Sequence, residues 1–134
     1  MDHPKIDIEP LPVTEEFRRQ KRLIQERGEL ALIEDGPAFH HLACFSLNPG
    51  QGLYRGGHYH ETKVERFYVV QGELLVECHD MDDGQRFEVR LRAGDRAVVH
   101  PRLAHRFSAV ESAWVIEYYE GTFDPDDDKP FHGW

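Results

Sequence analysis

The stretch that most constrains the fold runs from Gly52 to Gly72 and reads GLYRGGHYHETKVERFYVVQG. It places two histidines one residue apart, a glutamate five positions after the second, and glycines at both ends. In a β-strand the side chains of residues i and i+2 point to the same face, so His58 and His60 project together while Tyr59 points away. A fold that contains this stretch must therefore enclose two imidazoles in one small space.

Short β-rich runs separated by turn signals fill the chain after residue 28. The turn signals include Asp35-Gly36, Pro49-Gly50 and Asp83-Gly84. About eight or nine short strands at this spacing predict an antiparallel sandwich or barrel. We therefore expect an all-β protein with one domain, since 134 residues suffice for a real core but not for an additional dinucleotide-binding domain.

The chain divides into three expected segments: an N-terminal arm with a short helix at 1–28, a barrel at 29–120 and an acidic C-terminal tail at 121–134. We expect the helix over residues 14–27. Thr14 can cap it, two glutamates follow in the first turn, and three apolar residues lie on its length. Gly28 then ends it, because glycine adopts the backbone conformation found just after a helix.

The net charge of the chain argues against two classes of binding partner. A formal net charge of −9 argues against nucleic-acid backbones and anionic membrane surfaces, because both repel an acidic protein. Much of this charge lies in the C-terminal run FDPDDDKP, so a phosphate-bearing small-molecule substrate remains open. The sequence shows neither a basic leader followed by an apolar run nor an apolar run of membrane-spanning length. We therefore expect a cytoplasmic protein without nucleic-acid or membrane partners.

A third histidine follows in the block GDRAVVHPRLAHRF, which opens at Gly94 and contains His105. If neighbouring strands bring His105 beside the first group, three imidazoles and one carboxylate converge inside the barrel. Imidazole suits Zn, Fe, Ni or Cu, and the carboxylate adds the harder donor that Mn or Fe needs. We expect one divalent metal ion held by His58, His60, Glu65 and His105, with Zn or Ni favoured and Mn, Fe or Cu as alternatives. Paired strand histidines that face solvent or are hydrogen-bonded in the core are the alternative interpretation.

These residues resemble the two motifs of the cupin superfamily. The first motif, G-x5-H-x-H-x3–4-E-x6-G, is matched at every fixed position by Gly52 to Gly72. The second, G-x5-P-x-G-x2-H-x3-N, is matched at Gly94 and His105, while its proline, glycine and asparagine positions hold His100, Arg102 and Ala109. The resemblance covers roughly residues 29–120 and implies a cupin-type double-stranded β-helix, or jelly-roll barrel, with the four metal ligands. A cupin that has lost its metal and keeps a bare sugar site is the main alternative.

Within cupins, the run YRGGHYHETKVERFYVVQGELLVEC is similar to the C-terminal cupin domain of bifunctional capsular-polysaccharide enzymes that build UDP-N-acetyl-fucosamine-type sugars. It also resembles the nucleotide-sugar ketoisomerases. The resemblance implies a metal-dependent epimerase or isomerase that acts beside the keto group of a nucleotide sugar in polysaccharide biosynthesis, and a homodimer. A mononuclear metal dioxygenase of a small aromatic or enolic compound, and a non-catalytic small-molecule binding barrel, are the rival functions.

Proton abstraction beside a ketone needs an acid/base group and a donor for the anionic substrate. We expect His100 or Tyr68 as the acid/base residue, because an imidazole at the pocket edge titrates near neutral pH. Substrate-binding candidates are Arg55, Arg102 and Arg106, because they flank the motifs and a guanidinium can grip a phosphate or carboxylate with two hydrogen bonds. Ordinary solvent-facing charge is the alternative for these arginines.

Overall fold

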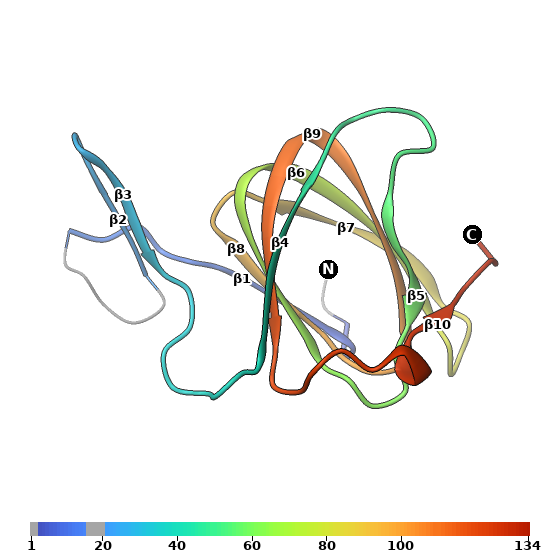
Figure 1. Ribbon diagram of the computed structural model, residues 1–134. Helices are drawn as coiled ribbons and strands as arrows, with labels where there is room; N and C mark the ends of the chain where they lie inside the picture. The colour runs from blue at the N-terminus through green and yellow to red at the C-terminus, as the bar shows by residue number, and fades with distance from the viewer. Residues whose placement is uncertain (1–2, 16–20) are drawn as a thin grey trace.

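Two long strands, β6 (Glu65–Asp80) and β9 (Leu103–Tyr119), pair in antiparallel fashion along most of their length and form the middle of the fold (Figure 1). The computed structural model describes residues 3–15 and 21–134. The other elements are β1 (Ile6–Pro10), β2 (Lys21–Gln25), β3 (Gly28–Leu32), β4 (His41–Leu47), β5 (Arg55–Tyr59), β7 (Arg86–Arg92), β8 (Asp95–Val99), a 3₁₀ turn η1 (Pro125–Asp127) and β10 (Lys129–Pro130).

The two long strands each belong to two sheets, and this closes the barrel. In β6, residues 65–68 pair with β8 and residues 73–79 pair with β7. In β9, residues 105–107 pair with β5 and residues 113–119 pair with β4. Strands that pass from one sheet to the facing sheet are typical of jelly rolls. The predicted all-β class and the cupin-type barrel are confirmed.

Gly72 lies where β6 passes between the sheets. The pairing of β6 with β9 shifts register on both sides of it, its φ is +87°, and a Cβ added there would lie 2.2 Å from the carbonyl oxygen of Ser112. Only a residue without a side chain accepts both the left-handed backbone and the close approach of β9. The barrel therefore requires glycine at position 72, the last position of the first motif.

The core fills the space between the two sheets. Alternate residues of β6 and β9 point inward, and the completely buried ones include Val69, Leu74, Val76 and Val115. Phe67 also points inward and meets Phe107 edge to face at a centroid distance of 4.9 Å. These apolar side chains fill one part of the barrel and leave the part next to β5 for polar residues.

The helix predicted over 14–27 is wrong where the structure describes it; residues 16–20 lie outside the described part of the chain. β2 and β3 form a two-stranded hairpin that projects from the barrel (Figure 1). The backbone N–H of Arg22 donates to the carbonyl of Pro12, and the backbone N–H of Thr14 donates to the carbonyl of Arg22. The Arg22 side chain donates to Glu29 of β3. Gly28, which was predicted to end a helix, instead begins β3 directly after the hairpin turn, with a φ of +132°.

Segments near both ends of the chain add strands to the large sheet. β1 pairs with β8, and β10 pairs with β5. Lys5, just before β1, forms an ion pair with Asp80 at the end of β6. Within residues 3–15 and 21–134, no helix has the length and apolar character that a membrane span requires.

Candidate metal centre

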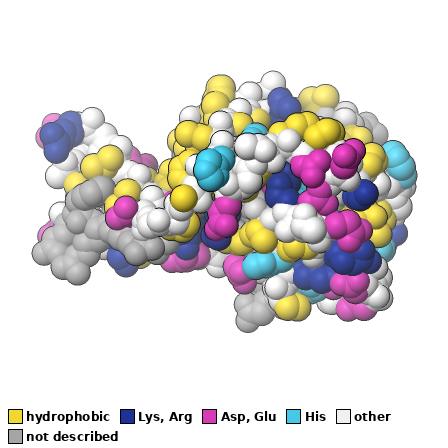
Figure 2. Space-filling model, turned by 60° about the horizontal axis from the view of Figure 1, so that its bottom comes forward, with side chains coloured by type: hydrophobic (Ala, Val, Ile, Leu, Met, Phe, Trp, Pro, Cys, Tyr) yellow, Lys and Arg dark blue, Asp and Glu magenta, His cyan; other side chains and the backbone are white. Residues whose placement is uncertain are grey.

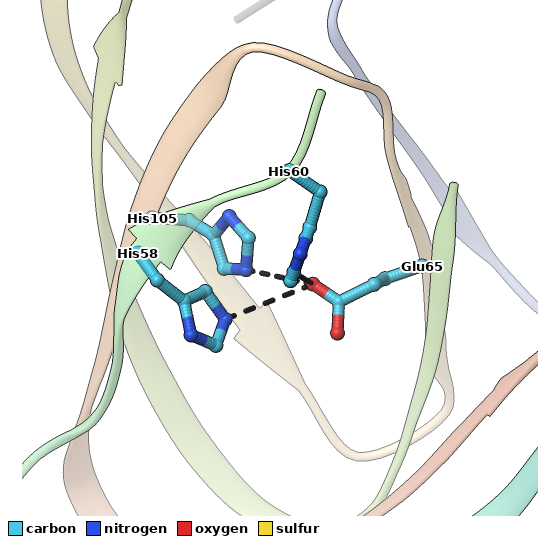
Figure 3. Close-up of side chains that lie close together, drawn as sticks. All are labelled: His58, His60, Glu65 and His105. Atoms are coloured by element: carbon cyan, nitrogen blue, oxygen red, sulfur yellow. Dashed lines mark hydrogen bonds and ion pairs between the residues drawn. The ribbon is translucent and has the colours of Figure 1, made fainter. Parts of the chain in front are cut away.

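Three histidines and one glutamate predicted as metal ligands come together at one end of the barrel cavity (Figure 3). Each histidine points its Nε2 atom at the same oxygen, Oε1 of Glu65. The distances to that oxygen are 2.8 Å from His60, 3.0 Å from His105 and 3.9 Å from His58. One ligand atom from each of the four residues can be chosen so that all lie within 4.8 Å of one another. The sequence prediction thus identified four side chains that the fold brings together.

Strand pairing explains why these residues meet. His58 of β5 and His105 of β9 are direct partners in the antiparallel ladder, next to a register shift after Gly56. A Cβ at Gly56 would lie 2.8 Å from the carbonyl oxygen of His105, so glycine allows the two strands to approach. Glu65 begins β6, on the other side of the loop that follows His60.

The Nδ1 atom of each imidazole faces an oxygen acceptor. Nδ1 of His60 bonds the carbonyl of Asp127 at 2.5 Å, and Nδ1 of His105 bonds the carbonyl of Leu103 at 2.9 Å. Nδ1 of His58 lies 2.9 Å from Oδ1 of Asp128. Carbonyl and carboxylate oxygens only accept, so each Nδ1 atom carries a proton. Nε2 of His60 also faces an acceptor, Oε1 of Glu65, and although burial would lower the pKa of His60, its contacts with Glu65 and Asp127 raise it.

The charge state of the cluster favours a cation. Burial would raise the pKa of Glu65, but its contacts with His105 and His60 hold that pKa well below its ordinary value. Burial, reinforced by His105, lowers the pKa of His58 to about 4, so this ring is neutral at neutral pH. Among the described residues, Nε2 of His105 is buried and makes no well-aligned hydrogen bond, although it lies 3.0 Å from Glu65. The buried carboxylate needs positive charge beside it, which a proton on His60 or a metal ion supplies, and the three imidazole nitrogens with one carboxylate oxygen are a donor set that fits a metal ion.

A cavity of about 290 Å³ adjoins the cluster, and both His58 and Glu65 line it. Its apolar walls are Phe45, Phe67 and Phe107. Its lining includes the ionisable side chains of Arg55, His58, Glu65 and Glu117. The four-residue cluster thus borders a space with room for a small molecule.

Neither predicted acid/base residue lines this cavity. Tyr68 is adjacent to inward-facing Phe67 and points to the opposite face of β6, where the charge of Arg22 acts on it. His100 binds Asp7 through Nε2 at 2.8 Å and borders a separate surface groove. Strand alternation and the pairing of β1 with β8 place these side chains outside the barrel interior.

Of the three predicted substrate-binding arginines, only Arg55 lines the cavity. Its Nε atom donates to the carbonyl of Ser46 at 2.9 Å, and its guanidinium lies over the ring of Phe45. Arg106 is next to inward-facing His105, so it points outward, where it binds Glu77 and lies over Trp134.

Arg102 belongs to a network of surface charges. It binds Glu61 at 3.0 Å and Asp82 at 2.7 Å. Figure 2, in which the bottom of the molecule comes forward, shows acidic and basic side chains intermixed on the surface of the barrel. Arg102 also has a φ of +64°, which is the turn position that the cupin motif fills with glycine. Its contacts are those of a surface residue.

Sequence reasoning missed two ionisable residues inside the barrel. Glu117 of β9 lines the same cavity as His58 and Glu65, and Nε2 of His41 lies 3.0 Å from its Oε2. The His41 ring also stacks on Tyr119 with centroids 4.0 Å apart. A signal was available, because Glu117 follows buried Val115 at a spacing of two and therefore had to face inward.

Comparison with known proteins adds a family and a fold. A family model described as the polysaccharide biosynthesis C-terminal domain matches residues 25–129. No curated protein sequence matches the chain.

Among solved structures, a mutant of the 3,4-ketoisomerase QdtA from Thermoanaerobacterium thermosaccharolyticum, in complex with TDP-4-keto-6-deoxyglucose, is similar to this chain. Its TM-score is 0.72 at 10% identity, over 95% of this chain and 88% of that one. The dTDP-4-dehydrorhamnose 3,5-epimerase from Sulfolobus tokodaii has a TM-score of 0.67 at 19% identity, over 81% and 71%. The capsular polysaccharide assembling protein CapF from Staphylococcus aureus has a TM-score of 0.63 at 20% identity, over 83% of this chain but 32% of CapF. The family match and these folds confirm the predicted resemblance.

Proposed function

Since this chain belongs to the family of polysaccharide biosynthesis C-terminal domains, we propose that it is an epimerase or isomerase of nucleotide-linked sugars that acts beside a keto group. The observation that carries the proposal is the cavity in which the metal-centre cluster meets Glu117, the partner of His41. The substrate class is supported by two proteins of the same fold, which are named as a ketoisomerase and an epimerase of nucleotide sugars.

We infer that His58, His60, Glu65 and His105 hold one divalent metal ion. Three imidazole nitrogens and one carboxylate oxygen suit zinc or nickel best, and manganese, iron and copper accept the same donors. When bound, such an ion supplies positive charge for the oxygen of the keto group. The neutral state of His58, which follows from its lowered pKa, keeps its Nε2 available as a ligand.

Glu117 is the residue of the cavity wall best suited to move the proton. In the proposed reaction its carboxylate takes the proton from the carbon beside the carbonyl, and Nε2 of His41, 3.0 Å away, shares that proton. Delivery of a proton from water to the opposite face of the same carbon, with the proton on Glu117 released to solvent, completes an epimerisation. Return of the proton to the former carbonyl carbon, with transfer of the neighbouring hydroxyl proton to the former carbonyl oxygen, completes an isomerisation. Both steps conserve protons and electrons, so neither oxygen nor a nicotinamide is consumed.

The other cavity residues orient the substrate and exclude water. Arg55 offers a guanidinium at the cavity wall, and guanidinium groups bind phosphates through paired hydrogen bonds. The three phenylalanines of the wall remove water from the reacting carbon, which strengthens every electrostatic interaction there. An exposed guanidinium beside a cavity that combines ionisable and aromatic side chains suits a sugar linked to a diphosphate.

Deuterium incorporation tests the proposed function. The protein is incubated with TDP-4-keto-6-deoxyglucose in deuterated water, and the sugar is analysed by NMR and mass spectrometry. We expect deuterium at a carbon next to the keto group without oxygen uptake or added nicotinamide.

The same donor set supports a second candidate, a metal-dependent dioxygenase. Oxygen consumption with a phenolic or enolic compound, together with no deuterium incorporation, would favour that function. If neither reaction occurs but the protein binds a small molecule, the binding-barrel alternative replaces both.

A further inference from the structure

The acidic segment at residues 124–130 lies against the two histidines of the first motif. β10 pairs with β5, with Pro130 opposite His58 and Lys129 opposite Tyr59. The backbone N–H of Phe131 donates to the carbonyl of Gly57 at 2.9 Å. Figure 1 shows η1 and β10 beside β5, far in sequence from the strand that they cover.

We propose that this segment is the outer shell of the metal centre, and that Asp127 and Asp128 are positioning residues for His60 and His58. The inference rests on the proposed metal site, but it does not depend on the reaction. The Asp127 carbonyl accepts from His60 and the Asp128 carboxylate faces Nδ1 of His58, so each ring is held with Nε2 as its ligand atom. An oxygen partner on the second ring nitrogen orients a metal-binding histidine and makes it a stronger donor.

Asp127 also fixes the loop that connects two of the ligands. Its carboxylate accepts from the backbone N–H groups of Glu61 at 2.6 Å, Thr62 at 3.2 Å and Lys63 at 3.0 Å. The Thr62 hydroxyl donates to it as well, at 2.9 Å. The loop from His60 to Glu65 is therefore tied to η1 by the same residue whose carbonyl orients His60.

Asp128 acts on His58 through the negative charge of its carboxylate. Its side chain is half-buried, and a carboxylate beside Nδ1 stabilises the tautomer that leaves Nε2 unprotonated. Two residues earlier, Asp126 has the same chemistry but an exposed side chain. Asp126 is therefore a matched control within the same turn.

Zinc affinity of the full-length protein tests the inference. The metal is removed, Zn²⁺ is added back in competition with a chromophoric chelator, and wild type is compared with Asp128→Ala, Asp128→Asn and Asp126→Ala. We expect Asp128→Ala to weaken Zn²⁺ binding about tenfold to a hundredfold. Asp128→Asn should weaken it less, because an amide oxygen still accepts from Nδ1, and Asp126→Ala should match wild type.

Two further measurements separate positioning from folding. The melting temperature of the metal-free Asp128→Asn variant should equal that of the metal-free wild type. The visible absorption of the Co²⁺-loaded variant should differ from that of the Co²⁺-loaded wild type, because the ligand field at His58 changes. Equal Zn²⁺ affinity in wild type and both Asp128 variants would overturn the outer-shell role and leave the metal site intact. A wild type that binds no Zn²⁺, Ni²⁺ or Co²⁺ would overturn both.

Discussion

His58 and His105 are partners across β5 and β9, and their rings meet edge to face with centroids 4.9 Å apart and planes at 79°. The two imidazoles come from opposite ends of the motif-bearing region, yet a single pairing of backbones sets their separation. Each Nδ1 faces an oxygen, and both Nε2 atoms face Glu65, so the Nε2 atoms are the proposed ligand atoms. This pair of strands is the frame on which the proposed metal centre depends.

The first prediction concerns metal content. We expect purified protein to carry about one divalent ion per chain, and His60→Ala to lose most of it, because His60 is buried and is one of the three proposed imidazole ligands. Elemental analysis by mass spectrometry measures the content. His132→Ala, at an exposed position, should keep the wild-type amount. Full occupancy in His60→Ala would refute the ligand assignment.

The second prediction concerns the acid/base pair. Glu117→Gln should slow deuterium incorporation into TDP-4-keto-6-deoxyglucose by on the order of a hundredfold or more, because the amide cannot accept the proton. His41→Gln should slow it less. Metal content should not change in either variant. Glu111→Gln is the control, since Glu111 lies on the same strand but is exposed. Wild-type exchange rates in Glu117→Gln would remove this residue from the mechanism.

The third prediction tests whether the reaction takes place in the cavity or in the surface groove that His100 borders. His100→Ala should retain deuterium exchange within about twofold of wild type, since general-base loss costs far more and His100 binds Asp7 outside the cavity. The measurement is the same exchange assay at several substrate concentrations. A loss of two orders of magnitude with intact metal content would return the acid/base role to His100.

The fourth prediction tests the bend in β6. Gly72→Ala should lower the free energy of unfolding by roughly 2–4 kcal/mol, because the new Cβ meets backbone in addition to the strained φ. Gly84 has a similar φ of +76°, but a Cβ added there would have nothing within 4 Å, so Gly84→Ala should cost about 1 kcal/mol. Urea denaturation followed by fluorescence measures both. Equal losses would show that the contact with Ser112 is unimportant.

The fifth prediction is a pH dependence of stability. Burial would raise the pKa of Asp80, but Lys5 and the backbone N–H of Asp82 lower it. A depressed carboxyl pKa in the folded state stabilises the protein above the ordinary pKa of about 3.8, and this contribution disappears as pH falls through the lower, folded-state value. Asp80→Asn should therefore be less stable than wild type at pH 7, with a difference that shrinks below about pH 4. A difference that does not vary with pH would contradict this role.

Local patterns predicted much of the barrel and the proposed ligands. Alternation with a period of two correctly placed His58 and His60 on one face of their strand, because neighbouring side chains of a strand point to opposite sides. Their spacing was enough to expect a shared space. His105 was added on the condition that neighbouring strands bring it there, and the cupin resemblance supported this. The helix predicted over 14–27 was wrong, because capping residues and a few apolar positions are also compatible with a β-hairpin. The hydrogen bonds of a hairpin join its two strands and do not depend on helix propensity.

By itself, the sequence determined the all-β class, the pair of inward histidines and the glycines at which the chain bends, since these depend on alternation and on backbone conformations open to single residues. Only the tertiary structure decided that Glu117 meets His41 and that Asp127 and Asp128 face the metal-centre histidines. The physical reason is that these contacts join residues distant along the chain, and their geometry follows from strand pairing and packing that no local pattern encodes.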